Sequence, residues 1–343
     1  MCGTLCIRSF WRGGIKHKKS SWVCLTLSKY LLTNFIPNEK LEQERKMENM
    51  EEEENKKGMF RAYQVAQEMI KDRLEDVDEE AAKEMGEVAQ NEVIVARGAY
   101  DFIERVFQKM EMPHKVVDSS AFEAFAPSPE QIIFLNCPGK VDEEGVRNLR
   151  NFVEKGGFLF TTDWALKHVI EPGFPGTLRY NGRATGDEVV RVEIDAKEDP
   201  FLKSLIGEGD DPQWWIEGSS YPIEILDPNN VEVLVRSKEV KEKYGENPVF
   251  TSFNYGKGKV YHMISHFYLQ RTETRTERHR RTGSDYMEEK LRMNSARRAK
   301  YRRMGVDRSS LGEVEAAYSS SALMGKVMYE KSVSLKEFRN DEL

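Results

Sequence analysis

The sequence predicts a doubly wound α/β domain, with a mostly parallel sheet, helices on both of its faces and helical extensions at both ends. Short apolar runs alternate with amphipathic helical patterns between residues 93 and 160, and short links join them. The run 147–163 shows an amphipathic helix, a Gly-Gly stop, a buried strand and then the polar pair Thr162 and Asp163. In such folds ligands are bound where the carboxyl ends of the strands meet, so this pair marks a candidate site.

The first elements follow from periodicity. Residues 59–90 space their apolar side chains as a helix does, within an acidic sequence. A short apolar strand is predicted at 93–96, a helix at 103–110 that ends before Pro113, and a second strand at 114–118.

The central elements carry sharper signals. The run 132–136 is too apolar for an exposed edge strand. Asp142 is placed to cap the helix that follows, and residues 156–157 provide its glycine stop. Residues 158–160 then form another buried strand.

Beyond Asp163 the pattern is less regular, although turn residues and apolar runs still define elements. The predicted elements there are a short helix at 200–205, strands at 189–194, 221–226, 231–235, 249–253 and 260–267, and helices at 271–304 and 309–329.

Composition divides the 343-residue chain into parts, because 32% of its residues are charged and the signs are segregated. We expect a poorly structured extension over 1–46, an acidic helical arm over 47–90, the α/β domain over 91–268 and a basic helical tail over 269–343. Met47 is an alternative start, since the acidic helical sequence begins there.

Cysteine usage indicates a reducing compartment. Three of the four cysteines precede residue 25 and Cys137 stands alone, so the sequence contains no disulfide framework. A basic and then apolar start resembles a signal peptide only weakly, and we interpret the ER-retention-like residues 340–343 as a coincidence. No apolar run reaches the length of a membrane span. We therefore expect a cytoplasmic protein.

Two stretches, 149–159 and 248–260, resemble the class I glutamine amidotransferase-like superfamily, especially its trehalose-utilisation-type and other non-amidotransferase branches. The resemblance implies a flavodoxin-like sheet over about 92–266. It also implies that the first stretch leads to the turn where true amidotransferases carry their nucleophilic Cys. Here that turn, 161–164, reads Thr-Thr-Asp-Trp, which implies loss of glutamine hydrolysis. His266 matches the place where the family often carries a His.

The candidate site residues are Asp163, His266, Thr162 and Cys137. An Asp-His pair at the sheet edge can act as a general base or hold a metal ion, whereas the simpler alternative is a helix cap and a strand-end polar residue. Cys137 is a nucleophile only if its pKa is lowered, and otherwise a small packed residue. His262 and His266 share a strand face about 13 Å apart, too far for one ion. We predict no cofactor and no dedicated metal site.

The segment 271–303 is strongly basic, with 12 Lys or Arg residues against 5 Asp or Glu residues. Nucleic-acid phosphates require such charge. Basic runs also form solvated helix faces and docking sites for acidic partners, among them another copy of this chain.

Two functions are consistent with these features. The first is a catalytically degenerate amidotransferase-like domain that serves in ligand binding or macromolecular assembly. The second is a hydrolase or lyase-type enzyme that uses Asp163 and His266, with Thr162 or Cys137 nearby.

Overall fold

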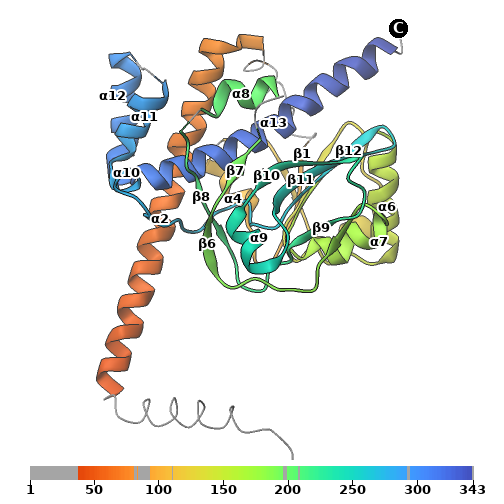
Figure 1. Ribbon diagram of the computed structural model, residues 1–343. Coiled ribbons are helices and arrows are strands. Elements are labelled where there is room, and N and C mark those ends of the chain that lie inside the picture. The colour runs from red at the N-terminus through yellow and green to blue at the C-terminus, as the bar shows by residue number, and fades with distance from the viewer. Residues whose placement is uncertain are drawn as a thin grey trace, which may run out of the picture. The chain divides into compact units, whose positions relative to one another are not determined.

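The protein is described by a computed structural model that covers residues 38–80, 83, 93–109, 111–195, 199–207, 209–291 and 294–341 (Figure 1). Residues 54–343 form one compact unit, separate from residues 1–53. Most of the extension predicted over 1–46, and the end of the acidic arm at 84–90, lie outside the described residues. None of the described helices is both long and apolar enough to cross a membrane.

A mixed eight-stranded sheet forms the centre of the compact unit, in the order β2-β1-β3-β4-β12-β11-β10-β7. The first five of these strands are parallel, and the last three pair antiparallel. The strands are β2 (Lys115–Val117), β1 (Val93–Ala96), β3 (Ile132–Leu135), β4 (Phe158–Thr162), β12 (Gly258–Met263), β11 (Pro248–Tyr255), β10 (Val231–Arg236) and β7 (Glu193–Ile194). The predicted α/β fold class is confirmed.

Strand β4 lies in the interior of the sheet, between β3 and β12, and runs parallel to both. Every residue of β4 is buried, as expected for a strand covered on both faces. The carboxyl ends of β3, β4 and β12 therefore meet at one edge, which is where a doubly wound fold places its ligand site.

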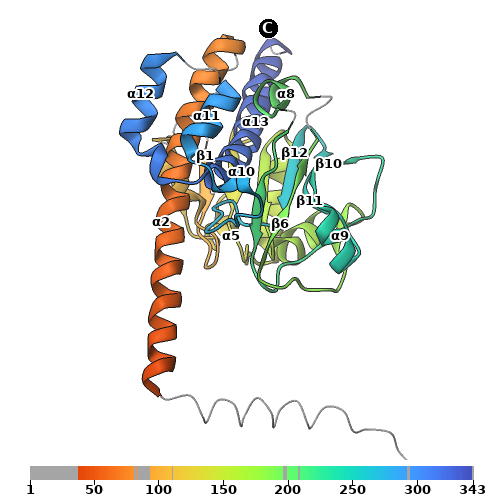
Figure 2. The ribbon, with the colours of Figure 1, turned by 60° about the vertical axis from the view of Figure 1, so that its left-hand side comes forward.

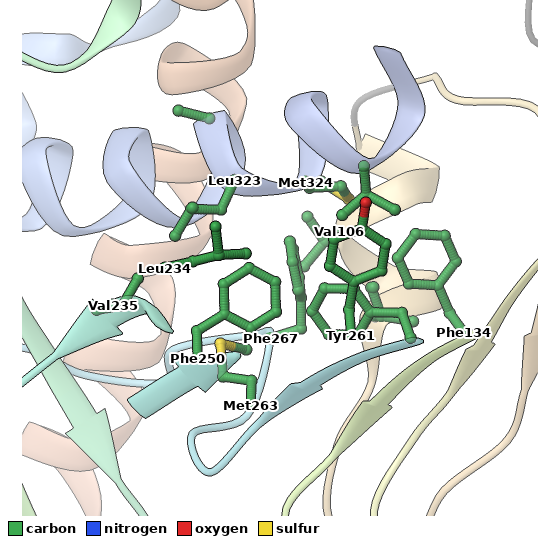
Figure 3. Close-up of a cluster of buried hydrophobic side chains, with 14 of the residues drawn as sticks. Val106, Phe134, Leu234, Val235, Phe250, Tyr261, Met263, Phe267, Leu323 and Met324 are labelled. Carbon is green, nitrogen blue, oxygen red and sulfur yellow. The ribbon is translucent and has the colours of Figure 1, made fainter. Parts of the chain in front are cut away.

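Helices cover both faces of the sheet. One face is covered by α4 (Ile103–Lys109) and α13 (Leu311–Asp341), whose Leu323 and Met324 pack above the rings of Phe250 and Tyr261 (Figure 3). Figure 1 shows α6 (Glu143–Glu154) and α7 (Glu171–Gly173) on the other face. Helix α5 (Ala121–Ala124) contacts α6.

Helix α6 begins and ends as its sequence predicts. The Asp142 carboxylate accepts the Gly145 N–H at 2.7 Å, which satisfies one of the free donors of the first turn. After the helix the chain turns back at Gly156 and Gly157. A Cβ at Gly157 would lie 2.2 Å from the Phe152 ring, so only glycine allows strand β4 to start this close to the helix.

In the second half of the chain, one predicted strand is divided in two and another strand was not predicted. The predicted strand 189–194 is two strands, because β6 (Glu188–Arg191) pairs with β8 (Gln213–Ile216) while β7 joins the main sheet. The sequence analysis missed β8, since its four residues are all buried and show no alternation. The chain also forms a small ladder of β5 (Leu178–Tyr180) with β9 (Ile223–Ile225).

The prediction of one strand over 260–267 was also wrong at its end. Strand β12 stops at Met263, and the chain then leaves the sheet. The Phe267 N–H donates to Asp101 Oδ2 at 3.1 Å, so a buried carboxylate holds this segment in place of a strand partner.

Further helices lie outside the sheet. The single helix predicted over 271–304 is interrupted, and its described parts are α10, α11 and α12, with Asn294 capping α12. Helix α2 starts before the predicted range and ends at Val77. The bounds are α2 (Asn38–Val77), α8 (Pro200–Leu205), α9 (Lys238–Tyr244), α10 (Glu277–Arg280), α11 (Gly283–Leu291), α12 (Ser295–Met304), the π-helical η1 (Leu166–Ile170) and the 3-10 turn η2 (Val306–Arg308).

Candidate functional site

The turn after β4 places Asp163 at the edge of the sheet in a strained conformation. Its φ is 46°, a left-handed value that is uncommon for residues other than glycine. The backbone is fixed by the Asp163 N–H, which donates to the Met263 carbonyl at 2.8 Å. The helix that follows, η1, has no side-chain cap. The Asp163 carboxylate instead accepts the Tyr221 N–H at its Oδ1, at 2.9 Å. The capping interpretation of Asp163 is therefore wrong.

His266 lies opposite Asp163, three residues beyond the end of β12. Its Nε2 is 3.6 Å from Asp163 Oδ2, and its Nδ1 is 3.1 Å from Glu217 Oε2. Despite these short distances, neither ring nitrogen has a partner of hydrogen-bonding geometry within the described part of the chain. Burial lowers the pKa of His266, but the carboxylates of Asp163, Asp101 and Glu217 outweigh it, so the pKa is raised overall.

Cys137 completes a cluster with these two residues. It follows β3, and its thiol donates to Asp163 Oδ2 at 3.6 Å. The thiol is buried, and burial together with the negative charge of Asp163 raises its pKa far above the ordinary value. The thiol is therefore protonated at neutral pH, which is the opposite of the activation that a nucleophile needs.

Thr162 lies in the same region, but its hydroxyl is already engaged. Oγ1 accepts the Cys137 N–H at 3.0 Å and donates to Asp101 Oδ2 at 2.9 Å. The four residues predicted for the site thus all lie at the carboxyl edge of neighbouring strands, and Thr162 serves there as a link between β3, β4 and Asp101.

Sequence reasoning missed Asp101, which is 1% exposed. Besides Thr162 and Phe267, its carboxylate accepts the Phe102 N–H at 2.8 Å and the Tyr268 N–H at 3.4 Å. It therefore fixes the segment that carries His266. Its position after the first strand of the sheet was the available signal, because the ends of parallel strands share one edge.

A loop between β8 and β9 covers the cluster and supplies Glu217. The loop is held by the Ser219 carbonyl, which accepts from Trp164 Nε1 at 2.8 Å, and by the Thr185 hydroxyl, which donates to the Glu217 carbonyl at 2.8 Å. Outside it, Trp164 stacks on Tyr221 with ring centroids 5.7 Å apart. Asp163 and His266 are only 2% and 1% exposed beneath this cover.

Two of the aromatic residues Trp214, Trp215 and Tyr221 lie near the site. Trp215 sets its ring edgewise to His266, with centroids 5.8 Å apart, whereas Trp214 is buried against α13 through Ser319. The two tryptophans point in opposite directions because they are successive residues of strand β8.

The structure also supports the rejection of His262 as a partner of His266. The His262 ring is fully buried, and its Nδ1 lies 2.8 Å from Thr161 Oγ1. Burial lowers its pKa to about 3, so this imidazole is neutral.

The basic segment 271–303 is extensively paired with carboxylates of the same chain. Arg297 of α12 contacts Asp72 and Asp76 of α2, and Lys300 contacts Glu68 at 2.6 Å. Figure 2 shows α12 beside α2, with α11 and α13 next to them. These ion pairs connect α12 to α2. They also neutralise the charges of Arg297 and Lys300, which are then less available to bind phosphates.

Comparison with known proteins gives no family assignment. No family model matches the sequence, and neither does any curated protein. Among solved structures, a glutamine amidotransferase from Thermotoga maritima matches 71% of this chain and 96% of its own, at 12% identity and a TM-score of 0.35. A putative ThuA-like protein from Bacteroides uniformis matches 52% and 82%, at 13% identity and a TM-score of 0.35.

An exo-β-1,4-mannosidase from an Opitutaceae bacterium matches 51% of this chain at 11% identity, with a TM-score of 0.36. The chain spans about a third of that enzyme, 31% of its length. Similarities this low do not decide function.

Proposed function

We propose that this chain is a catalytically degenerate amidotransferase-like domain that serves in ligand binding or macromolecular assembly. The supporting observation is the cluster after β4, where Asp163 takes the left-handed turn position at which true amidotransferases of the resembled superfamily carry Cys. A carboxylate there cannot form the thioester through which such enzymes release ammonia.

The surroundings of Asp163 support the same proposal. The Cys137 thiol has a raised pKa, because burial and the charge of Asp163 disfavour its thiolate form. The Thr162 hydroxyl is engaged on both sides. The loop of Glu217 covers the three residues of the cluster, so a substrate the size of glutamine has no direct approach to them.

The second candidate is a hydrolase or lyase-type enzyme. It is favoured by one observation, the approach of His266 Nε2 to within 3.6 Å of Asp163 Oδ2, next to a buried thiol. A His held beside a carboxylate is the arrangement of a general base. In that case the loop of Glu217 must open to admit substrate.

Ammonia release from glutamine by the full chain tests the proposal. We expect release at the rate of buffer alone, and the same result with generic ester and amide substrates. Turnover of glutamine would contradict the proposal. Hydrolysis of another substrate that is lost in both D163N and H266N would also contradict it, and would favour the hydrolase or lyase-type enzyme. The control is R183A, a substitution at an exposed position, which should leave any observed hydrolysis unchanged.

A further inference from the structure

We propose that Cys137, Asp163 and His266 form a binding site for a transition-metal ion, with Zn²⁺ as the expected occupant. This inference rests on the proposed function, because it names the ligand of the same buried cluster. The three ligand atoms come from the ends of three adjacent regions of the sheet and all lie within 4.8 Å of one another.

The distances fit one ion. Zn²⁺ binds thiolate sulfur at about 2.3 Å and imidazole nitrogen or carboxylate oxygen at about 2.0 Å, so tetrahedral ligand atoms lie roughly 3.3–3.5 Å apart. The observed separations are 3.6 Å from Cys137 Sγ to Asp163 Oδ2 and 3.6 Å from His266 Nε2 to the same oxygen. The third pair of ligand atoms, from Cys137 and His266, lies within 4.8 Å, so the side chains must move closer to bring all three atoms around a common centre.

The donor types select the metal. Thiolate and imidazole ligands suit Zn²⁺ and related transition metals, whereas Mg²⁺ and Ca²⁺ prefer shells of oxygen atoms. A site of three protein ligands leaves a fourth position for water or a ligand atom.

A second, independent observation is the orphaned imidazole. His266 is 1% exposed, and neither ring nitrogen has a hydrogen-bond partner of good geometry within the described residues. Buried polar groups are nearly always hydrogen-bonded, so this buried imidazole calls for an explanation. Coordination of Nε2 by a metal ion, with Nδ1–H donating to Glu217 after a small rotation, satisfies both nitrogens.

The surrounding residues already resemble the outer shell of a metal site. Metal-binding histidines commonly donate their second nitrogen to a carboxylate, and Glu217 Oε2 lies 3.1 Å from Nδ1. Asp163 is oriented by the Tyr221 N–H, which donates to its Oδ1 at 2.9 Å. Two of the three ligands, Asp163 and His266, thus have a contact outside the cluster.

Glu217 also provides the route of entry. Its side chain is 34% exposed, whereas the His266 side chain behind it is 1% exposed. A small cation therefore reaches the cluster by displacing one loop, with a carboxylate at the opening. Binding replaces the thiol proton of Cys137, so the affinity must fall as pH falls.

The test uses the full chain with Cys2, Cys6 and Cys24 changed to Ser, so that Cys137 is its only thiol. The chelator-treated protein is titrated with Co²⁺, whose thiolate complexes absorb visibly, and Zn²⁺ then displaces it. We expect one ion per chain, a sulfur-to-cobalt band, and a melting temperature that rises with Zn²⁺. Absence of the band and of stoichiometric Zn²⁺ would overturn the proposal.

Variants in this background locate the site. H266A and C137S are expected to lower the Zn²⁺ affinity at least 100-fold, and E217Q about 10-fold or more, because outer-shell partners typically contribute 10–100-fold. H262N is the matched control, a buried histidine whose loss leaves the affinity unchanged. Circular dichroism checks that each variant is folded. If H266A or C137S unfolds, E217Q still tests the site, because Glu217 is not a metal ligand in this proposal. Equal affinity in H266A and H262N would refute the assignment.

The two proposals fail separately. Glutamine turnover by protein that binds one Zn²⁺ ion per chain would contradict only the proposed function. No turnover and no metal would contradict only the metal assignment.

Discussion

At the scale of single residues, Asp163 decides what this fold is able to do. Its backbone adopts the strained left-handed turn, at a cost of the order of 1–3 kcal/mol, and its carboxylate then lies between a thiol and an imidazole. The charge of Asp163 favours the cationic form of His266 and disfavours the thiolate of Cys137. One carboxylate therefore disfavours the thiolate and favours the imidazolium on its two sides.

The sequence predicted these residues but not their contacts. Parallel strands bring their carboxyl ends to one edge, so Cys137, Thr162, Asp163 and His266 were predicted from position alone. Asp101 and Glu217 were missed because each acts through long-range contacts, to a segment that leaves the sheet and to a covering loop. No local pattern in a sequence reports such contacts.

His262 gives a prediction on pH dependence. Its folded pKa is about 3, below the unfolded value near 6.5, so only the unfolded chain binds this proton between these values. Stability is thus lost as pH falls from about 6.5 towards 3, by up to about 1.4 kcal/mol per pH unit from this residue. Urea unfolding at several pH values measures it. H262N should show a shallower loss, and identical slopes for the two proteins would contradict the prediction.

At the scale of elements, α13 is the main departure from what the sequence suggested. The predicted helix over 309–329 extends to Asp341, and its middle is buried on nearly all sides. Tyr261 contacts Glu330 of α13, and Trp214 Nε1 donates to Ser319 Oγ at 3.0 Å. Its polar residues concealed this burial, because serine and charged side chains that pair in the core resemble a solvent-exposed face in sequence.

Regular amphipathic elements were predicted well. Helix α6 has its cap, apolar face and glycine stop within one short segment, so local chemistry and tertiary packing agree. The strand pairs β6–β8 and β7–β10 were not predicted, because antiparallel partners distant in sequence are chosen by packing and not by propensity.

Leu323 tests the role of α13. Its side chain is 2% exposed and packs over the sheet face, so L323A should lower the unfolding free energy by about 2–5 kcal/mol (Figure 3). Urea unfolding followed by circular dichroism measures the change. L226A removes the same atoms from a position that is 40% exposed, and it should cost less than about 1 kcal/mol. Similar losses for both variants would show that α13 is not part of the core.

At the scale of the whole molecule, the acidic and basic parts of the chain meet each other. Arg297 and Lys300 of α12 contact carboxylates of α2, and Arg278 contacts the buried Glu315 of α13 at 2.9 Å. Charge segregation in the sequence indicated only that these parts could bind a partner of opposite charge. It carried no information about whether the partner was nucleic acid, another protein or the chain itself.

This pairing leads to a prediction about nucleic acid. We expect no gel shift with unspecific DNA or RNA at physiological ionic strength, because phosphate binding would require the ion pairs of Arg297 and Lys300 to break. A shift that weakens with added salt and is lost in R298A/R302A/R303A would contradict this expectation. Deletion of 271–343 is unsuitable as a control, since it removes the core helix α13.

The central claim is that the thiol at this edge of the sheet is not a reactive nucleophile. The reaction of Cys137 with a colorimetric disulfide reagent, in chelator-treated protein that lacks Cys2, Cys6 and Cys24, tests it most directly. Burial and the raised thiol pKa predict almost no reaction in the folded protein at neutral pH, and one thiol per chain after unfolding. Rapid stoichiometric modification of the folded protein would contradict the account, because it would reveal an accessible thiolate at the edge.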